Sequence, residues 1–388
     1  MGRIVSEGLR IVRIHNLNMK LLLTAKQRGS TNVLAPLARE LIERGHDLTI
    51  YATGNENEAA GFQGLDYEHL QLAVYDLSLL TQGYDAVVTG LSGYDTLDGR
   101  FLRAANRLKI PTIAVQDMNS NYVLRLGTNP ADLPTLLAVM SEDCIETARK
   151  ELGDEMGEEA AKKSRVVGWA AFDHYAKMRE DFTEAKRTEL LSSIGINPEN
   201  PVYVHFTQTM HPEAAYLKRL NKPYTERMEN FLYEQGVTQC TFEAASDLGL
   251  KLVVKPHPGE EYSRNYTKYL ADRHGFTFIP PSWCSTPELI LAANSVTAGR
   301  STCLVEGTLL DRNTGGILPE IKEEELTPFP PVVLEAIPYT LEWRRPIIAV
   351  LEMLTNPDLR KNLAANRKKF SVDGKAAKRL ADLVESLR

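Results

Sequence analysis

The stretch Leu252-Val253-Val254-Lys255-Pro256-His257-Pro258-Gly259 passes from an apolar run directly into a turn with two prolines. Apolar residues without alternation are typical of a strand that is buried on both faces, as in a parallel sheet. The prolines lack the backbone N–H that a sheet requires, so the strand must end there. Open α/β sheets bind ligands at the carboxyl ends of their strands. We therefore predict that Lys255 and His257 contact an anionic group such as a phosphate, while a plain polar turn capped by His257 stays open.

Length and composition limit the class of protein. A chain of 388 residues exceeds one ordinary hydrophobic core, which favours two domains. Hydrophobic residues at 43% and charged residues at 25% are typical of a soluble globular protein. The net charge of −6 argues against a general nucleic-acid binder, so no nucleic-acid partner is predicted. Without a membrane-spanning apolar segment or a leader sequence, we expect a cytoplasmic location. The four cysteines are scattered, so neither a disulfide framework nor a metal site is predicted.

The first α/β unit begins near Met19. A strand is predicted over 21–25, a polar loop over 27–32, a helix over 33–44 and a second strand over 47–52. Gly29 and Ser30 would offer small side chains and free amides at the helix start, which suits an anion or a sugar. A tight turn without a ligand is an equal alternative. Residues 1–18 form either an added edge strand or a segment before the true start.

Two more strands of this unit end in polar clusters. The strands are predicted over 86–89 and 112–115, and the clusters that follow them contain Asp95 and Asp117. In a parallel sheet, both carboxylates would reach the same edge as the Gly29 loop and face a common cleft. Each carboxylate also has a simpler interpretation, because an acidic residue at a strand end often only caps the next helix.

A second α/β unit starts after Pro198 and Pro201. Its strand over 295–298 runs into Gly299-Arg300-Ser301-Thr302, and Glu306 follows one helical turn later. Amides and hydroxyls at this helix start could hold a phosphate. Glu306 could accept hydrogen bonds from ribose hydroxyls, although an N-cap Ser301 and a solvated Glu306 are the alternative. We predict domains over 1–170 and 200–355 and a helical C-terminal segment over 356–388.

These features together resemble the GT-B superfamily, which comprises nucleotide-sugar glycosyltransferases and the non-hydrolysing UDP-N-acetylglucosamine 2-epimerases. The resemblance rests on Arg44-Gly45-His46 before the second strand, Lys255-Pro256-His257-Pro258, and Gly299-Arg300-Ser301-Thr302 with Glu306. It implies an α/β fold with two Rossmann-like domains facing each other across a cleft. The N-terminal domain would bind the acceptor and the C-terminal domain the nucleotide donor. The last helix, over 359–387, would cross back to the N-terminal domain.

A narrower resemblance is to capsule and lipopolysaccharide transferases that use CMP-activated sugars, and to transferases that use CDP-glycerol. Several of these carry a His-Pro motif and a later Ser-Ser or Ser-Thr motif, which His257-Pro258 and Ser301-Thr302 match. The acidic motif of sialyltransferases is not evident. The epimerase runs His-Arg-Arg-Glu-Asn and Asp-Ser-Gly-Gly are absent too. Asp117 nevertheless falls where an epimerase acid/base carboxylate would lie, so the epimerase stays the second reading.

The resemblance implies a metal-independent glycosyltransferase of polysaccharide biosynthesis, with a nucleotide-sugar as substrate and no separate cofactor. It would move a sugar or a polyol phosphate to a glycan or lipid-linked acceptor. Asp117 is the first candidate for the general base and Asp95 the second. The phosphates would lie against the C-terminal residues, and Glu306 would bind ribose. The residues assigned to phosphate contact are Lys255, His257, Arg300, Ser301 and Thr302.

Several alternatives stay open beside this reading. They are a UDP-N-acetylglucosamine 2-epimerase-like enzyme and a non-catalytic nucleotide- or glycan-binding protein. The basic face of the C-terminal segment, with Lys361, Arg367 and Lys368 among its residues, is either solvated or touches an anionic membrane surface. Peripheral contact with the inner face of the membrane therefore stays an open alternative. A homodimer is a further one.

Overall fold

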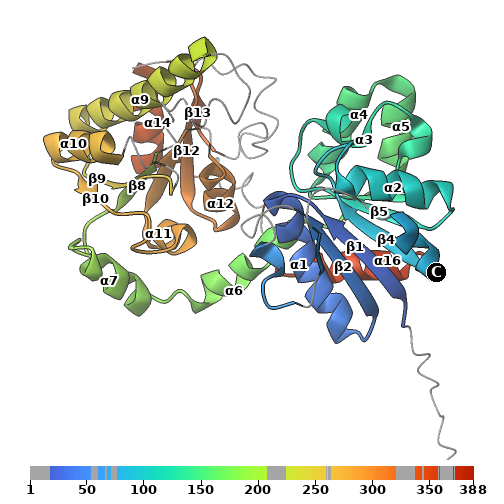
Figure 1. Ribbon diagram of the computed structural model, residues 1–388. Coiled ribbons are helices and arrows are strands. Elements are labelled where there is room, and N and C mark those ends of the chain that lie inside the picture. The colour runs from blue at the N-terminus through green and yellow to red at the C-terminus, as the bar shows by residue number, and fades with distance from the viewer. Residues whose placement is uncertain are drawn as a thin grey trace, which may run out of the picture.

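The computed structural model contains two α/β halves, each built on its own parallel sheet (Figure 1). It describes residues 18–53, 60–65, 68–70, 77–207, 224–258, 260, 264–299, 301–319, 337–342, 345–356, 358, 370 and 372–388. Two helices, α6 (His174–Asp181) and α7 (Glu184–Ser193), join the halves in the chain (green in Figure 1).

The first sheet has seven strands in the order β3-β2-β1-β4-β5-β6-β7, and every pair is parallel. The strands are β1 (Lys20–Ala25), β2 (Asp47–Thr53), β3 (Glu68–Leu70), β4 (Ala86–Gly90), β5 (Thr112–Val115), β6 (Leu136–Val139) and β7 (Ser164–Val166). Leu21 pairs with Leu48 on one side and with Ala86 on the other. The strand order reverses between β1 and β4, and ligands of doubly wound sheets bind at such a reversal.

The second sheet repeats this plan with six strands in the order β10-β9-β8-β11-β12-β13. Its strands are β8 (Tyr203–Phe206), β9 (Leu252–Lys255), β10 (Thr277–Phe278), β11 (Ser295–Ala298), β12 (Asn313–Ile317) and β13 (Tyr339–Thr340). All four residues of β9 are buried, as the apolar run before Pro256 predicts. The reversal here lies between β8 and β11, so the loops after these two strands flank the equivalent position.

Helices cover both sheets. They are α1 (Arg28–Glu43), α2 (Leu97–Arg107), α3 (Tyr122–Leu126), α4 (Glu142–Leu152), α5 (Asp154–Lys163), α9 (Tyr224–Asp247), α10 (Arg264–His274), α11 (Thr286–Ala292), α12 (Cys303–Leu309), α14 (Arg345–Thr355) and α16 (Ala376–Glu385). A capping box between Ser285 and Glu288 starts α11, as its sequence pattern suggests. The two-domain α/β prediction is thus confirmed, while the residue boundaries of the domains stay a prediction.

One local prediction was wrong. Residues 28–32 belong to α1 and do not form a loop, because the helix starts at Arg28 and runs through Pro36. The charged segment 142–163 is two helices, since Gly153 adopts a positive φ of 78° between them. The segment 173–191 also breaks, and Thr183 caps the second helix by accepting a hydrogen bond from the Lys186 N–H.

The described end of the chain packs on the first half. Leu380 and Val384 of α16 are buried in one core with Leu34 and Leu37 of α1, and α16 lies beside the first sheet (red in Figure 1). Asp173 accepts hydrogen bonds from the first backbone amides of α16, Ala376 N at 3.0 Å and Ala377 N at 2.7 Å. Residues 359–369 of the predicted helix lie outside the described residues.

No helix in the described part of the chain is long and apolar enough to cross a bilayer.

Candidate functional site

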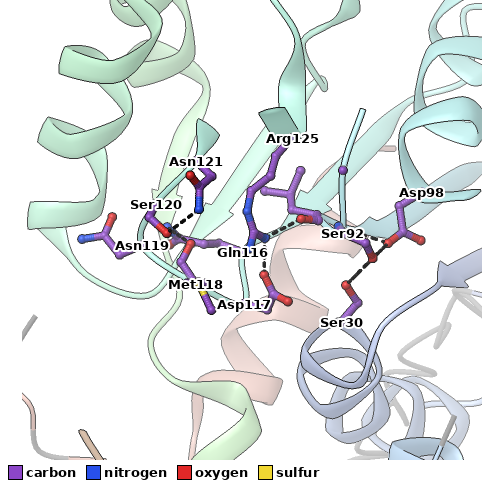
Figure 2. A network of polar contacts seen from close by, with 12 residues as sticks. Ser30, Ser92, Asp98, Gln116, Asp117, Met118, Asn119, Ser120, Asn121 and Arg125 are labelled. Carbon is purple, nitrogen blue, oxygen red and sulfur yellow. Dashed lines mark hydrogen bonds and ion pairs between the residues drawn. The ribbon is translucent and has the colours of Figure 1, made fainter. Parts of the chain in front are cut away.

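Asp117 follows β5 and lies against the first turn of α1 (Figure 2). Its side chain is only 6% exposed, and its carboxylate forms a 2.5 Å ion pair with Nη1 of Arg125, which also donates to the Leu91 carbonyl. A Cβ built on Gly29 would lie 3.1 Å from Cγ of Asp117 and even closer to its Oδ2. Gly29 therefore lets the carboxylate approach the positive end of the α1 dipole, which stabilises its charge.

A second carboxylate, Asp98, lies beside Ser30 at the strand-order reversal of the first sheet. Its Oδ2 accepts hydrogen bonds from the Ser92 hydroxyl and from the Ser92 N–H at 3.3 Å. The hydroxyls of Ser30 and Ser92 are 2.9 Å apart, and dashed lines in Figure 2 connect this cluster. Burial, with a smaller contribution from the Asp117 charge, raises the pKa of Asp98 to about 6. Asp98 is therefore half-protonated near pH 6 and mostly charged at pH 7.

The sequence analysis did not predict a role for Asp98, and it predicted a ligand contact for Ser30. Asp98 sits in the first turn of α2, where an acidic residue normally needs no further explanation. Ser30 was assigned to a ligand, but it is fully buried and its hydroxyl is engaged with Ser92 and Asp98. Ser30 therefore stabilises the polar cluster around Asp98 from the protein interior.

Asp95 does not join these carboxylates. Its side chain is 86% exposed, and its carboxylate lies 3.8 Å from Nη2 of Arg103. The common cleft expected for Asp95 and Asp117 stays a prediction, and of the two only Asp117 is buried. The carboxylate whose charge acts on Asp98 is Asp117.

The segment after β5 is held in place by Gln116, whose amide donates to the Tyr122 hydroxyl and to the Met118 carbonyl. Gln116 Oε1 accepts from the Met140 N–H at 3.2 Å. The same segment exposes apolar side chains, because Met118 is 41% and Leu124 is 71% exposed. The segment that carries Asp117 is thus fixed by the Gln116 hydrogen bonds and exposes apolar side chains to solvent.

In the second sheet, Lys255 ends β9 as predicted, but its side chain is buried. Its ammonium donates to the Cys284 carbonyl, and burial lowers the pKa of Lys255. The lysine therefore supports the turn that leads to α11. Its assignment to phosphate contact is weakened by this burial.

His257 is exposed in the turn after β9, and its carbonyl accepts a 2.9 Å hydrogen bond from the Glu260 N–H. Glu260 is completely buried below this turn. Its carboxylate accepts from the hydroxyl of Thr207, after β8, and from the Thr267 hydroxyl at 3.3 Å. Burial raises the pKa of Glu260 to about 7. Sequence reasoning missed this group, although its place directly after the His-Pro turn was a usable signal.

The residues after β11 form a second polar cluster. Ser301 Oγ accepts from the Cys303 N–H at 3.2 Å, and the Thr302 hydroxyl donates to Glu306 Oε1 at 3.2 Å. Glu306 Oε2 accepts a 2.6 Å hydrogen bond from the hydroxyl of Tyr175, in α6. The structure thus brings Ser301, Thr302 and Glu306 together and adds Tyr175. Arg300 lies outside the described residues.

His205 in β8 is not available to a ligand. It is buried, its Nδ1 lies 2.9 Å from Thr297 Oγ1, and its ring packs edge-on against Phe242. Burial lowers the pKa of His205 to about 4, so the imidazole is neutral at pH 7.

Two open cavities in the described part of the chain lie apart from these residues. One, of about 480 Å³, is lined by residues of α6, α7 and α11, and the other, of about 570 Å³, contains Arg187 and Arg312. None of the predicted site residues lines either cavity. Among described residues, no group of three His, Cys, Asp or Glu side chains could hold a metal ion.

Sequence comparison gives no relatives, since no family model and no curated protein matches the chain. Solved structures do match. UDP-GlcNAc 2-epimerase from Neisseria meningitidis, solved with UDP-GlcNAc, has a TM-score of 0.65 at 14% identity, covering 95% of this chain and all of that one. MurG from Acinetobacter baumannii has a TM-score of 0.60 at 12% identity, with coverages of 95% and 99%.

The wall teichoic acid polymerase TagF is also similar, with a TM-score of 0.54 at 11% identity and coverages of 95% and 88%. At such identities the likeness establishes the fold alone. The chain has the GT-B fold, the fold that glycosyltransferases and UDP-GlcNAc 2-epimerases share among its structural neighbours. The predicted resemblance is confirmed at this level.

Proposed function

We propose that this protein is an enzyme that uses a nucleotide-activated sugar, and specifically a glycosyltransferase that needs no metal. The observation that carries the proposal is the placement of the two polar clusters. Asp98 lies at the strand-order reversal of the first sheet, Asp117 reaches the start of α1 beside it from the end of β5, and Ser301 with Glu306 lies at the reversal of the second sheet. Doubly wound sheets bind nucleotides and small molecules at these positions.

In the proposed reaction, the second sheet binds the donor. His257 and Ser301 contact the phosphates, Thr302 lies beside them, and Arg300 stays assigned to the same role from the sequence. Lys255 acts indirectly, because its ammonium is engaged with the Cys284 carbonyl. Preorganised donors at the leaving phosphate are how such an enzyme would stabilise the transition state.

The first sheet binds the acceptor, and Asp117 takes the proton of the attacking hydroxyl. Such a general base contributes about 10²- to 10⁴-fold to a rate. The exposed Met118 and Leu124 favour an acceptor with an apolar part, which a lipid-linked glycan would provide. Peripheral contact with the inner face of a membrane, a cytoplasmic location and a homodimer remain predictions from the sequence.

A second candidate, an epimerase acting on a UDP-N-acetylhexosamine, is favoured by the pairing of Asp117 with Asp98. An epimerase must remove a proton from one face of a sugar carbon and return one to the other face. Two neighbouring carboxyl groups are suited to these two tasks, and burial raises the pKa of Asp98 to about 6.

The test starts with thermal shift across UDP-, CDP-, CMP- and GDP-sugars, because a ligand that binds the native state raises its melting temperature. The active donor is then incubated with and without acceptor in deuterated buffer. Transfer supports the transferase, and exchange at the sugar C2 without acceptor supports the epimerase. A protein that binds the nucleotide but shows neither would be a non-catalytic binding protein.

Variants separate the two halves of the site. We expect His257→Ala to weaken donor binding at least tenfold and Asp117→Asn to lower turnover at least a hundredfold with little change in donor affinity. His274→Ala, at the far end of α10 and bonded to Ser246, is the matched histidine control. If His257→Ala leaves donor affinity unchanged, the phosphate assignment is wrong.

A further inference from the structure

The linker helix α6 is bonded directly to the loop that the second sheet uses for its proposed ligand. The Tyr175 hydroxyl donates to Glu306 Oε2 at 2.6 Å across 131 residues of sequence. One turn later in α6, Arg179 donates to the Leu309 carbonyl at the end of α12 and to the Val372 carbonyl. Two contacts one turn apart fix both the position and the rotation of α6 against α12.

Tyr175 itself has little freedom. Its side chain is buried, and its ring packs against Phe172 at a centroid distance of 5.2 Å and against His174 at 4.5 Å. Burial and the neighbouring Glu306 charge raise the pKa of Tyr175, so it is a neutral phenol and a hydrogen-bond donor at physiological pH. The direction of the hydroxyl is therefore set by the linker.

Each carboxylate oxygen of Glu306 accepts one hydrogen bond within the protein and can accept another. Tyr175 binds Oε2 and Thr302 binds Oε1. A carboxylate accepts about four hydrogen bonds, so each oxygen keeps one acceptor position, and the side chain is only partly buried. Two acceptor positions on one fixed carboxylate match two neighbouring hydroxyls, such as the 2′- and 3′-hydroxyls of ribose.

We infer that Tyr175 is a positioning residue, which holds the Glu306 carboxylate in the orientation that recognises the ribose diol of the donor nucleotide. This inference rests on the proposed function, because it concerns the same donor site. It makes ribose recognition depend on the linker: a displacement of α6 that pulls Tyr175 from Glu306 would release the carboxylate.

The test measures affinities for UDP and CDP and for their 2′-deoxy forms by titration calorimetry, on the full chain. The readout is the ratio of the dissociation constants of the deoxy and ribo forms. A hydrogen bond to a charged group corresponds to about tenfold or more in affinity. We expect wild type to prefer the ribonucleotide by about tenfold and Glu306→Gln to lose this preference.

Tyr175→Phe keeps the ring and removes only the hydroxyl. We expect it to reduce the ribo preference to about threefold or less, with the affinity for the deoxynucleotide unchanged. Tyr94→Phe is the matched control, since the Tyr94 hydroxyl also bonds a carboxylate, Asp132 at 2.7 Å, in the other half of the protein. That control should keep the wild-type ratio.

The remaining outcomes distinguish the positioning role of Tyr175 from the proposed function of the protein. If Tyr175→Phe weakens both nucleotides equally, or leaves the ratio as in wild type, the positioning role is wrong while the proposed function stands. If wild type binds neither UDP nor CDP in either form, and no nucleotide-sugar in the thermal-shift screen, the proposed function fails and this inference fails with it.

Discussion

Gly29 and Asp117 lie in close contact, and the Asp117 carboxylate fills the space that a Cβ atom on Gly29 would need. The two residues are far apart in the sequence and meet because β1 and β5 both end at the same edge of the first sheet. This contact places a carboxylate at the start of α1, where its charge is favoured by the helix dipole.

The contact can be tested by a double-mutant cycle. An alanine in an ordinary helix is more stable than a glycine by about 0.5–1 kcal/mol, but here Gly29→Ala should destabilise by about 1–3 kcal/mol because the new methyl group is overpacked. In the Asp117→Ala background the clash is gone, and the same substitution should be neutral or stabilising. Urea denaturation of the four proteins measures this. Equal effects in both backgrounds would contradict the contact.

Asp98 should give the protein a specific pH dependence. Its pKa is raised by burial to about 6, so folding favours the protonated form. The stabilising contribution is complete below the ordinary aspartate pKa and is lost as the pH rises through 6. Relative to Asp98→Asn, wild type should lose about 3 kcal/mol of unfolding free energy between pH 3.5 and 7, at about 1.4 kcal/mol per pKa unit. Parallel stability curves for both proteins would refute the shift.

His205 should act in the opposite direction. Its pKa is lowered by burial to about 4, so the folded protein keeps the neutral imidazole while the unfolded chain is protonated below pH 6.5. Stability is therefore lost as the pH falls from 6.5 towards 4. His205→Asn, which keeps a polar side chain that does not titrate, should remove about 3 kcal/mol of this acid sensitivity. Measuring urea midpoints at pH 4.5, 5.5 and 7 for both proteins provides the comparison.

Asp173 should stabilise the C-terminal helix α16 against unfolding. Its carboxylate caps α16 through two backbone amides, although it lies more than 200 residues earlier. Asp173→Ala should cost about 1–2 kcal/mol, as the loss of a helix cap does, and should speed tryptic cleavage after Lys375 and Lys378. Asp181→Ala, an exposed substitution in the same linker helix, is the control and should leave the cleavage rate unchanged.

Features that depend on neighbours in the chain were predictable from the sequence. The strand over 252–255 follows from an apolar run that ends at two prolines, and both signals are local. The start of α11 follows from the Thr286-Pro287 pattern for the same reason, although the residue that caps the helix is Ser285 and not Thr286. Repetition of such units along 388 residues was enough to predict two parallel sheets.

The composition of the candidate site was only partly predictable. Asp117, Ser301 and Glu306 could be proposed because a strand end is recognisable in the sequence. Whether a side chain at a strand end points to solvent, as Asp95 does, or into a buried cluster, as Asp98 does, depends on the elements packed above it. The burial of Lys255 had no signal, because a lysine beside a proline turn is normally exposed.

By itself the sequence determined the alternation of strands and helices, and with it the class of fold, because backbone hydrogen bonding and the burial of apolar runs act over short distances. Tertiary structure alone decided which groups meet: Gly29 with Asp117, Ser30 with Asp98, and Tyr175 with Glu306. These pairs are set by the order of strands in each sheet and by the path of the linker. Hydrogen bonds and charges act only at contact distance, so their partners are chosen by the fold and not by position along the chain.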